Sequence, residues 1–273
     1  MTSPISFISD FGHHDEFVGV VHGVIAKLAP QSQVIDLNHS IGRGDIKAGA
    51  LSLVRAIQYL PEGVVLAVID PGVGTGRRAL AVSTHWGHFV GPDNGVLSPA
   101  VAMVGGALSM VSIESGEVMI PSPGATFQGR DVFAPAAALL ASGGARLEDL
   151  GPVVDPDSTV PLLLPLPEAG DESVTGEVWW VDHFGNSQTN IGPDELAALS
   201  LAPGGSMTVR IGSSSHEMRW VTAYGDADSG ELVAHVDSAG LMSFAVNGGR
   251  ADEELSLTEG TVVTLGKGSP TPE

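Results

Sequence analysis

The sequence predicts an α/β N-terminal domain with a mostly parallel sheet, followed by a smaller all-β C-terminal domain that is a barrel or a sandwich. Two patterns support this fold class. In the first half, short apolar runs alternate with segments in which apolar residues recur at helical spacing, an order typical of parallel sheets with right-handed crossovers. In the second half, short runs of alternating polarity are separated by turn residues, which is typical of small barrels and sandwiches.

The elements of the first half follow from their boundary residues. Residues 5–9 form an apolar strand, Asp15 starts a helix that stops at Pro30, and Asp45 starts a second helix that Pro61 ends. The remaining elements are an alanine-rich helix that runs to about residue 141 and strands at residues 33–37, 64–70, 79–83, 88–90 and 108–113.

The domain boundary lies in a stretch of unusual composition. From Gly151 to Ser173 the chain holds five prolines, several acids and no helical period, which is typical of a linker. We therefore expect an α/β domain at residues 1–152, a linker at 153–173 and a β domain at 174–273. The β domain carries one short helix at residues 194–199 and strands at residues 177–181, 207–211, 218–222, 232–236, 241–246 and 261–265.

The composition limits the possible partners. The chain has 32 acidic and 12 basic residues, a net charge of −20. Such a surface repels nucleic acid and anionic lipid, because binding to phosphate backbones depends on Lys and Arg. Cysteine is absent, which excludes disulfides and thiolate nucleophiles. No apolar run reaches about eighteen residues and no leader precedes the first strand, so we expect no membrane span and a cytoplasmic location.

The stretch from Val68 to Arg78 is the strongest candidate for a ligand site. An apolar run delivers Asp70 into a loop with three glycines and one proline, and Arg77 and Arg78 follow. Open sheets of this kind bind ligands beyond the carboxyl ends of their strands, and glycines let a ligand approach the backbone closely. Arg77 can fold back to pair with Asp70. A tight turn with a structural ion pair would give the same pattern.

Several other chemistries are excluded by spacing. Nine histidines suggest a metal, but the run from His13 to Glu16 consists of adjacent loop residues that cannot converge on one ion. The glycines at 72, 74 and 76 do not match the dinucleotide spacing, and no phosphate-cradling loop or Gly-x-Ser-x-Gly elbow occurs. We expect no metal and no bound cofactor.

A set of carboxylates, amides and aromatic rings at loop positions remains. The carboxylates and amides suit a ligand with hydroxyl and ammonium groups, and the rings could stack on a base. The polar residues are Asp10, Asp15, Asp70, Asp182, Asn186, Asn190 and Asn247, and the aromatic residues are Phe127, Phe184 and Tyr224. The residues themselves therefore predict a site for a polar small-molecule substrate.

Four motifs carry a resemblance to a known family. They are Ser9-Asp10-Phe11-Gly12, Asp70-Pro71-Gly72-Val73-Gly74-Thr75 with Arg77, Thr126-Phe127-x-Gly129-Arg130-Asp131, and Asp182-x-Phe184-Gly185-Asn186-x-x-Thr189-Asn190. In this order the chain resembles the S-adenosyl-L-methionine hydroxide adenosyltransferase family, relatives of the fluorinase and chlorinase. The resemblance implies cleavage of S-adenosyl-L-methionine at C5′ by water, giving adenosine and L-methionine. It also implies a homotrimer with sites between one subunit's N-domain and its neighbour's C-domain.

The resemblance also assigns site residues. The family's Asp-Arg-His triad falls on Asp70, Arg77 and Gln128, and Asp10 matches the acid that holds the ribose hydroxyls. Phe127 belongs to the third motif. Asp15 and Asp182 match positions near the methionine ammonium, and Ser238 matches one near its carboxylate. Phe184 and Tyr224 match the residues on the faces of the adenine, and Asn186, Asn247 and Gly248 match those at its edge.

Two departures from the family pattern affect the expected activity. Gly44 stands where the family usually has an aromatic residue, and Gln128 stands in place of the histidine. A glutamine amide forms hydrogen bonds but does not titrate near neutral pH, so acid-base catalysis worth about 10²–10⁴-fold would be missing. A nucleoside-binding homologue with weak or no turnover is therefore one alternative.

Halogenation is the other alternative. Halogenase relatives carry neutral residues where this chain has Asp70. A carboxylate ~4 Å from a halide costs roughly 4 kcal/mol at an effective dielectric constant of ~20, before compensation by Arg77. Water carries no such cost, so we rank hydrolysis above chlorinase-like halogenation.

Overall fold

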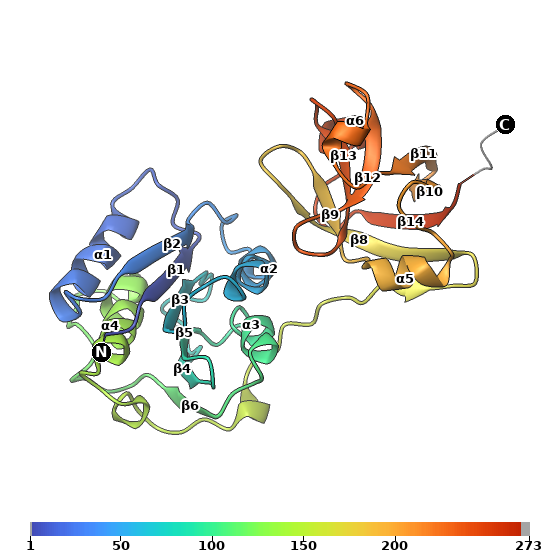
Figure 1. Ribbon diagram of the computed structural model, residues 1–273. Helices are drawn as coiled ribbons and strands as arrows, with labels where there is room; N and C mark the ends of the chain where they lie inside the picture. The colour runs from blue at the N-terminus through green and yellow to red at the C-terminus, as the bar shows by residue number, and fades with distance from the viewer. Residues whose placement is uncertain (1, 269–273) are drawn as a thin grey trace. The chain divides into compact units, whose positions relative to one another are not determined.

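The computed structural model describes residues 2–268 and divides into two compact units. The first unit ends at Leu163 and the second begins at Leu164, inside the stretch predicted to be a linker (Figure 1). We call them the α/β unit and the barrel unit. No helix within residues 2–268 has the length and apolar character needed to cross a membrane.

The α/β unit contains one six-stranded sheet. Its strands are β1 (Ile5–Ser9), β2 (Val34–Asn38), β3 (Val64–Val68), β4 (Ala79–Ser83), β5 (His88–Pro92) and β6 (Ser109–Ser112), in the order β2-β1-β3-β5-β4-β6. The pairings among β2, β1, β3 and β5 are parallel, whereas β4 pairs antiparallel with both β5 and β6.

The expectation of a mostly parallel sheet is therefore wrong, because the sheet is mixed. The reason is the short connection between β4 and β5. A crossover between parallel strands needs a dozen or more residues, whereas only the turn around Trp86 and Gly87 joins these two strands. Thr84 closes this turn, because its backbone N–H donates to the Gly87 carbonyl at 2.8 Å.

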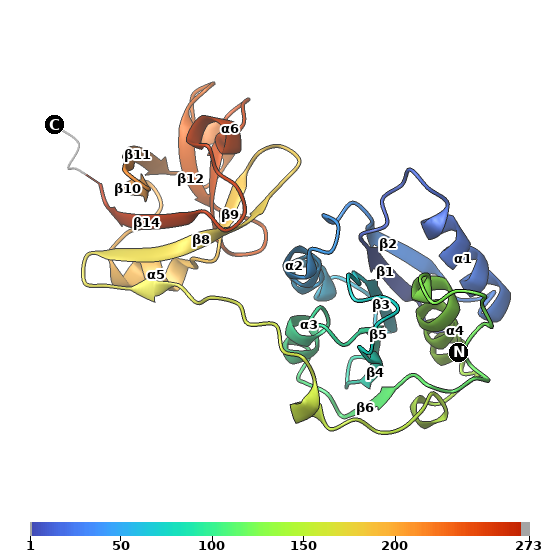
Figure 2. The same ribbon diagram turned by 180° about the vertical axis from the view of Figure 1, so that it is seen from behind.

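Helices cover both faces of this sheet (Figures 1 and 2). One apolar core joins α1 (Phe17–Leu28) and α4 (Ala134–Ser142) to one face, and a second core joins α2 (Ile46–Ile57) and α3 (Ser98–Met103) to the other. Successive residues of β3 alternate between the two cores, as the pleat of a strand requires. A π-helical turn precedes α4, and 3-10 turns occur at Leu147–Asp149 and Pro156–Ser158.

The helix starts were predicted with mixed success. Asp45 caps α2 as expected, because its side chain accepts a hydrogen bond from the Ala48 backbone at 2.9 Å. The expected start of α1 at Asp15 is wrong, because Glu16 occupies the N-cap position and makes no side-chain capping bond. The short helix α3 was not predicted, since its six residues include one proline and are too few to show a helical period.

The barrel unit is a closed seven-stranded barrel. Its strands are β7 (Glu168–Ala169), β8 (Ser173–Val181), β9 (Ser187–Thr189), β10 (Ser206–Ile211), β11 (Ser214–Trp220), β12 (Leu232–Val236), β13 (Met242–Val246) and β14 (Val262–Lys267). The order is β14-β10-β11-β12-β13-β9-β8, and a pairing of β14 with β8 closes the ring, leaving β7 outside it. The all-β prediction is confirmed in its barrel form.

Two short helices and a 3-10 turn accompany the barrel, namely α5 (Pro193–Ala198), α6 (Ala251–Leu255) and Tyr224–Asp226. Only α5 was predicted. The interior is filled by apolar residues from all sides of the ring, including Val174, Met207, Trp220 and Phe244. The loops that connect the strands lie at the ends of the barrel, and they carry several of the predicted site residues, among them Asp182, Phe184 and Asn186.

Candidate functional site

The centre of the candidate site in the α/β unit is an ion pair that follows β3. Arg77 folds back onto Asp70, with its Nε donating to Asp70 Oδ1 at 2.9 Å and its Nη2 donating to Oδ2. The side chains are only 5% exposed for Asp70 and 12% for Arg77. Arg77 Nη2 also donates to Gln128 Oε1, so the pair and a residue 51 positions further along the chain form one hydrogen-bonded chain.

Local structure places Gln128 within reach of this pair. Gln128 is the N-cap residue of the π-helical turn Gly129–Phe133, a kind of irregularity often found at functional sites. A Cβ atom on Gly129 would lie 2.8 Å from the tip of the Phe11 ring, so a larger residue here would require that ring to move. The Phe133 ring lies under Arg77, 5.1 Å from the guanidinium carbon.

The structure separates the two adjacent arginines. Arg77 bonds to Asp70, whereas Arg78 turns to Asp93 and Ser158. Arg78 Nε donates to Asp93 Oδ2 at 2.8 Å, and its Nη1 donates to Ser158 Oγ at 2.9 Å. Arg77 is therefore the arginine of the site, a choice that the sequence left open.

Asp10 lies at the end of β1, beside the loop that carries Asp70. Its Oδ2 accepts a hydrogen bond from the Gly44 backbone at 2.8 Å. Gly44 has a φ of +69°, and a Cβ atom there would lie 3.3 Å from the Pro71 side chain. An aromatic residue at this position would be strained in the backbone conformation that Gly44 adopts here.

The remaining predicted residues of this unit are Phe127 and Asp15. The Phe127 ring packs edge-on against Phe11 and Phe17, at centroid distances of 5.8 and 5.0 Å. Asp15 is exposed in the loop before α1, and no hydrogen bond or ion pair within residues 2–268 joins it to the other candidates. The structure thus brings Asp70, Arg77 and Gln128 together and leaves Asp15 apart.

In the barrel unit, Asp182 organises the loop that follows β8. Its Oδ1 accepts from the backbone N–H groups of Phe184 at 2.8 Å and Asn186 at 2.9 Å, and its Oδ2 accepts from Asn186 Nδ2 at 2.8 Å. Asn186 Nδ2 also contacts Tyr224 Oη at 3.2 Å. Gly185 has a φ of +87°, and a Cβ there would lie 2.5 Å from Asp252, so the turn requires glycine.

Asp182, Asn186 and Tyr224 line a cavity of about 310 Å³ at one end of the barrel. Four predicted residues are among those that line it, namely Asp182, Asn186, Tyr224 and Ser238. The sequence reasoning missed the others that carry chemistry, which are Gln188, His235 and Asp237. Gln188 Nε2 donates to Asp237 Oδ2, and Tyr224 Oη lies 3.3 Å from His235 Nε2. The alternating run of β12 placed His235 among apolar residues and so gave no sign that it faces a cavity.

The ionisable groups of this cavity differ in charge. Burial lowers the pKa of His235, although the carboxylates of Asp237 and Asp182 oppose this shift. Burial also raises the pKa of Tyr224, and the same two carboxylates add to that effect. At neutral pH the cavity therefore presents a neutral phenol and imidazole beside negative charge, which suits a ligand that carries an ammonium group.

Four predicted residues of this unit do not line the cavity. Asn190 is buried, and its Nδ2 donates to the Pro165 carbonyl at 3.0 Å. Phe184 is 72% exposed, with its ring against His183. Asn247 Nδ2 donates to the Ala227 carbonyl at 2.8 Å, and Gly248 is an exposed residue with a φ of +81°. Among residues 2–268 there is also no group of three or more His, Asp or Glu side chains placed to hold a metal ion.

Comparison with known proteins supports a single family. The chain matches the model of the SAM hydroxide adenosyltransferase N-terminal domain over residues 5–151 and that of the C-terminal domain over residues 176–264. It is 45% identical over 260 residues to a Salinispora tropica protein named (R)-S-adenosyl-L-methionine hydrolase, covering 94% of this chain and 95% of that one. A Thermus thermophilus protein of the same name is 43% identical over 269 residues, covering 96% and 99%.

A more distant relative and a solved structure are similar to this chain over almost its whole length. A fluorinase from Nocardia brasiliensis is 28% identical over 289 residues and covers 96% of both chains. A Thermotoga maritima crystal structure described as an uncharacterized conserved protein superposes with a TM-score of 0.90 at 37% identity, covering 96% of this chain and 100% of that one. The chain therefore belongs to the S-adenosyl-L-methionine hydroxide adenosyltransferase family.

Proposed function

We propose that this protein hydrolyses S-adenosyl-L-methionine at C5′ and releases adenosine and L-methionine. The observation that supports this proposal most is the hydrogen-bonded chain of Asp70, Arg77 and Gln128. It occurs in a protein that is 43–45% identical to relatives named (R)-S-adenosyl-L-methionine hydrolase. The fluorinases are only 26–28% identical, so halogenation has less support.

The reaction is an in-line displacement. A water oxygen attacks C5′ as the bond from C5′ to sulfur breaks, and the electron pair of that bond leaves with sulfur as a neutral thioether. The water loses one proton, first to Asp70 and then to solvent. Holding the oxygen about 3–3.5 Å from the carbon can remove several kcal/mol of the barrier.

Asp70 is suited to hold this water. Arg77 occupies both carboxylate oxygens from one side, and each oxygen keeps lone-pair capacity for a water proton. The carboxylate is therefore fixed in orientation while it remains able to accept. The same buried negative charge disfavours a halide at the site, by roughly 4 kcal/mol at ~4 Å and an effective dielectric constant of ~20 before compensation by Arg77.

Gln128 takes part as a donor. Its Oε1 accepts from Arg77, which leaves the amide NH₂ group to donate to a lone pair of the attacking water. Within the described part of the chain, no protein group accepts from this NH₂. Glutamine can thus orient the water but cannot take its proton, and Asp70 carries that step alone.

The barrel unit supplies groups that recognise the substrate. We assign Asp182 to the methionine ammonium, Ser238 to its carboxylate, and Tyr224 and Asn186 to the adenine, because all four line one cavity. We also assign Asp10 to the ribose hydroxyls, Asp15 to the ammonium, Phe127 to a wall of the nucleoside site, and the outer adenine contacts to Phe184, Asn247 and Gly248.

We further propose that the enzyme is a cytoplasmic homotrimer that needs no cofactor. The proposed substrate contacts are divided between two units that are each compact by themselves. A trimer with each site between the α/β unit of one subunit and the barrel unit of its neighbour would combine them. Sedimentation analysis should then give a mass close to three times 27.9 kDa, and a monomer with full activity would contradict this arrangement.

The function is tested by incubation with S-adenosyl-L-methionine in ¹⁸O-labelled water with added chloride. We expect adenosine that carries ¹⁸O at its 5′ oxygen, together with one equivalent of methionine. Predominant 5′-chloro-5′-deoxyadenosine would favour the halogenase alternative. Tight binding of the substrate with no methionine released over hours would favour a nucleoside-binding homologue.

A further inference from the structure

Two consecutive residues hold the two ends of the loop that carries Asp70 and Arg77. Asp93 and Asn94 follow β5, the neighbour of β3 in the sheet. Asn94 Nδ2 donates to the carbonyl of Ile69 at 2.8 Å, immediately before Asp70. The Asp93 backbone N–H donates to the carbonyl of Arg78 at 3.0 Å, immediately after Arg77. The eight-residue loop is thus fixed at both of its stems by one turn.

The Arg78 stem is fixed a second time by side chains. Asp93 Oδ2 accepts from Arg78 Nε at 2.8 Å, and the Asp93 side chain is only 4% exposed. Arg78 also donates to the side chain and the backbone of Ser158. A buried carboxylate in this position therefore determines the course of the backbone at Arg78.

We call Asp93 and Asn94 the clamp. The Arg78 carbonyl links the clamp to the pair of Asp70 and Arg77. It accepts a hydrogen bond from Arg77 Nη1 at 3.0 Å, in addition to the bond from the Asp93 backbone. The Arg77 guanidinium is thus held by Asp70 and Gln128 through Nε and Nη2, and by the Arg78 carbonyl through Nη1. A shift of that carbonyl would rotate the guanidinium and carry the Asp70 carboxylate with it.

We propose that Asp93 and Asn94 are positioning residues that set the orientation of Asp70 and Arg77. This inference rests on the hydrolysis proposed above. Neither residue touches the reacting atoms, and both act through the stems of the loop. A misplacement of about 1 Å at a reacting centre can cost 10²-fold in rate, so small movements of the stems are sufficient to matter.

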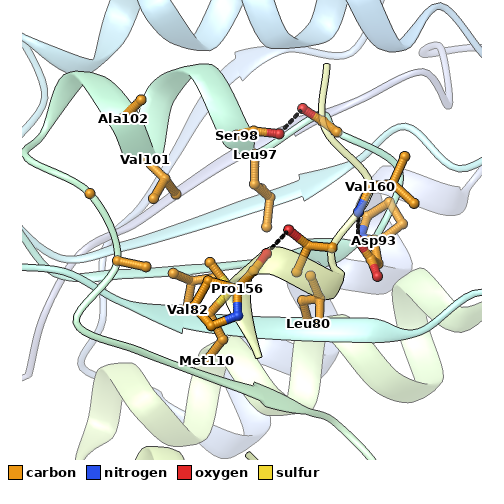
Figure 3. Close-up of a pocket in the computed structure, with 15 residues that line it drawn as sticks. Leu80, Val82, Asp93, Leu97, Ser98, Val101, Ala102, Met110, Pro156 and Val160 are labelled. Carbon is orange, nitrogen blue, oxygen red and sulfur yellow. Dashed lines mark hydrogen bonds between the residues drawn. The ribbon is translucent and has the colours of Figure 1, made fainter. Parts of the chain in front are cut away.

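Asp93 has a second role that must be separated from this one. It lies at the edge of an apolar cavity of about 280 Å³ bounded by β4, α3 and residues 156–160 (Figure 3). Asp93 Oδ1 accepts from the Val160 backbone at 2.9 Å, so Asp93 also ties that segment to the sheet. A change at Asp93 could act through packing alone.

Asn94 gives the cleaner experiment. Its Nδ2 bonds to Ile69, its Oδ1 accepts from the Val96 backbone at 3.2 Å, and no hydrogen bond joins it to residues 156–160 among the described residues. Asn94→Asp keeps the shape and the bond to Val96 but replaces the donor at Ile69 with an oxygen that repels the carbonyl. Only the stem before Asp70 is then disturbed.

The matched control is Ser98→Ala. Ser98 Oγ donates to the Gly95 carbonyl at 2.9 Å (Figure 3). It is thus a side-chain donor to a backbone carbonyl, as Asn94 is, but at the start of α3, and among the described residues no hydrogen bond joins its side chain to Ile69 or Arg78. A general weakening of this region would affect both variants in the same way. Only a positioning role predicts a difference between them.

The experiment measures kcat and KM for S-adenosyl-L-methionine in the full chain, together with the thermal midpoint. We expect Asn94→Asp to lower kcat at least about tenfold with KM within about twofold, whereas Ser98→Ala changes neither. Equal kcat values for Asn94→Asp and the wild type would overturn the inference. Asn94→Ala, which also removes the donor to the Ile69 carbonyl, serves as the second variant if Asn94→Asp does not fold, with the same kcat and KM pattern required. A wild type that releases no adenosine would overturn the proposed function itself, and this inference with it.

Discussion

The two units hold their candidate residues in different ways. In the α/β unit a buried ion pair, 5% and 12% exposed, is fixed from three sides by Gln128, the Arg78 carbonyl and the clamp at Asp93 and Asn94. In the barrel unit the carboxylates of Asp182 and Asp237, together with amides, hydroxyls and rings, surround an open cavity, and Tyr224 is 46% exposed.

This difference suggests that the α/β unit serves the chemical step and the barrel unit serves substrate recognition. Displacement chemistry needs one oxygen held at a defined position, and charged groups with buried partners provide that order. Recognition of a nucleoside and an amino acid needs complementary donors, acceptors and ring faces, which exposed loops can supply. We therefore expect changes in the α/β unit to alter mainly kcat and changes in the barrel unit to alter mainly KM.

The largest effect should follow replacement of the central carboxylate. Asp70→Asn removes the proton acceptor and the charged partner of Arg77, so we expect kcat to fall roughly 10²–10³-fold. KM should change by no more than a few fold, because the barrel contacts remain. Initial rates of adenosine release would measure both constants. A variant with half or more of the wild-type kcat would show that this carboxylate does not orient the water.

The corresponding change in the barrel unit should act on binding. Asp182→Asn removes the charge proposed to bind the methionine ammonium, and hydrogen bonds to charged groups contribute about 1.5–3 kcal/mol. We therefore expect KM to rise about 10- to 100-fold with kcat nearly unchanged. The control is Asp194→Asn, which removes an exposed acid of the same unit from the first turn of α5. A fall in kcat with an unchanged KM would contradict the division between the units.

The sequence predicted contacts between residues that are close together in the chain better than contacts between distant residues. Local patterns located Asp70 and Arg77, because a strand, a glycine loop and a following arginine lie within ten residues of one another. The turn at Asp93 and Asn94 was also visible in the sequence as turn chemistry. Its contacts to Ile69 and Arg78 were not, because they depend on β5 lying between β3 and β4.

The fold was predictable to a similar degree. Alternation of strands and helices identified the α/β unit, and alternating polarity identified the β unit. The sheet was wrongly predicted to be mostly parallel, although the short turn at Trp86 and Gly87 already required one antiparallel pair. Closure of the barrel by β14 and β8 joins residues about 90 positions apart, and no local pattern encodes such a pairing.

A gain of activity would test the role of Gln128 in the α/β unit. Gln128→His restores a group that can take a proton near neutral pH, and general acid-base catalysis typically contributes 10²–10⁴-fold. Since Asp70 already serves as acceptor, we expect a smaller increase in kcat, of about tenfold, which single-turnover rates would measure. The control is Gln58→His, an exposed position at the end of α2. An unchanged rate for Gln128→His would show that this side chain does not act on the water.

The smallest effect concerns the pH dependence of stability in the two units. Burial lowers the pKa of His39 and His88 in the α/β unit and of His235 in the barrel unit. A histidine whose pKa is lower in the folded state binds its proton more weakly there than in the unfolded chain. The stability that it contributes is complete above the unfolded value of about 6.5 and is lost as the pH falls toward the folded value.

We therefore expect the free energy of unfolding to decrease between pH 7.5 and pH 5.5, by at most about 1.4 kcal/mol per pH unit for each histidine. Urea denaturation of the wild type, His39→Asn and His235→Asn at several pH values would measure it, and each substitution should flatten the slope. His39 should show the clearer effect on structure near the site, because its Nδ1 lies 2.7 Å from the buried Ser9 hydroxyl, next to Asp10, and its carbonyl accepts from the Gly12 backbone at 2.7 Å. A stability that rises as the pH falls would mean that these imidazoles gain protons on folding, which their buried environment opposes.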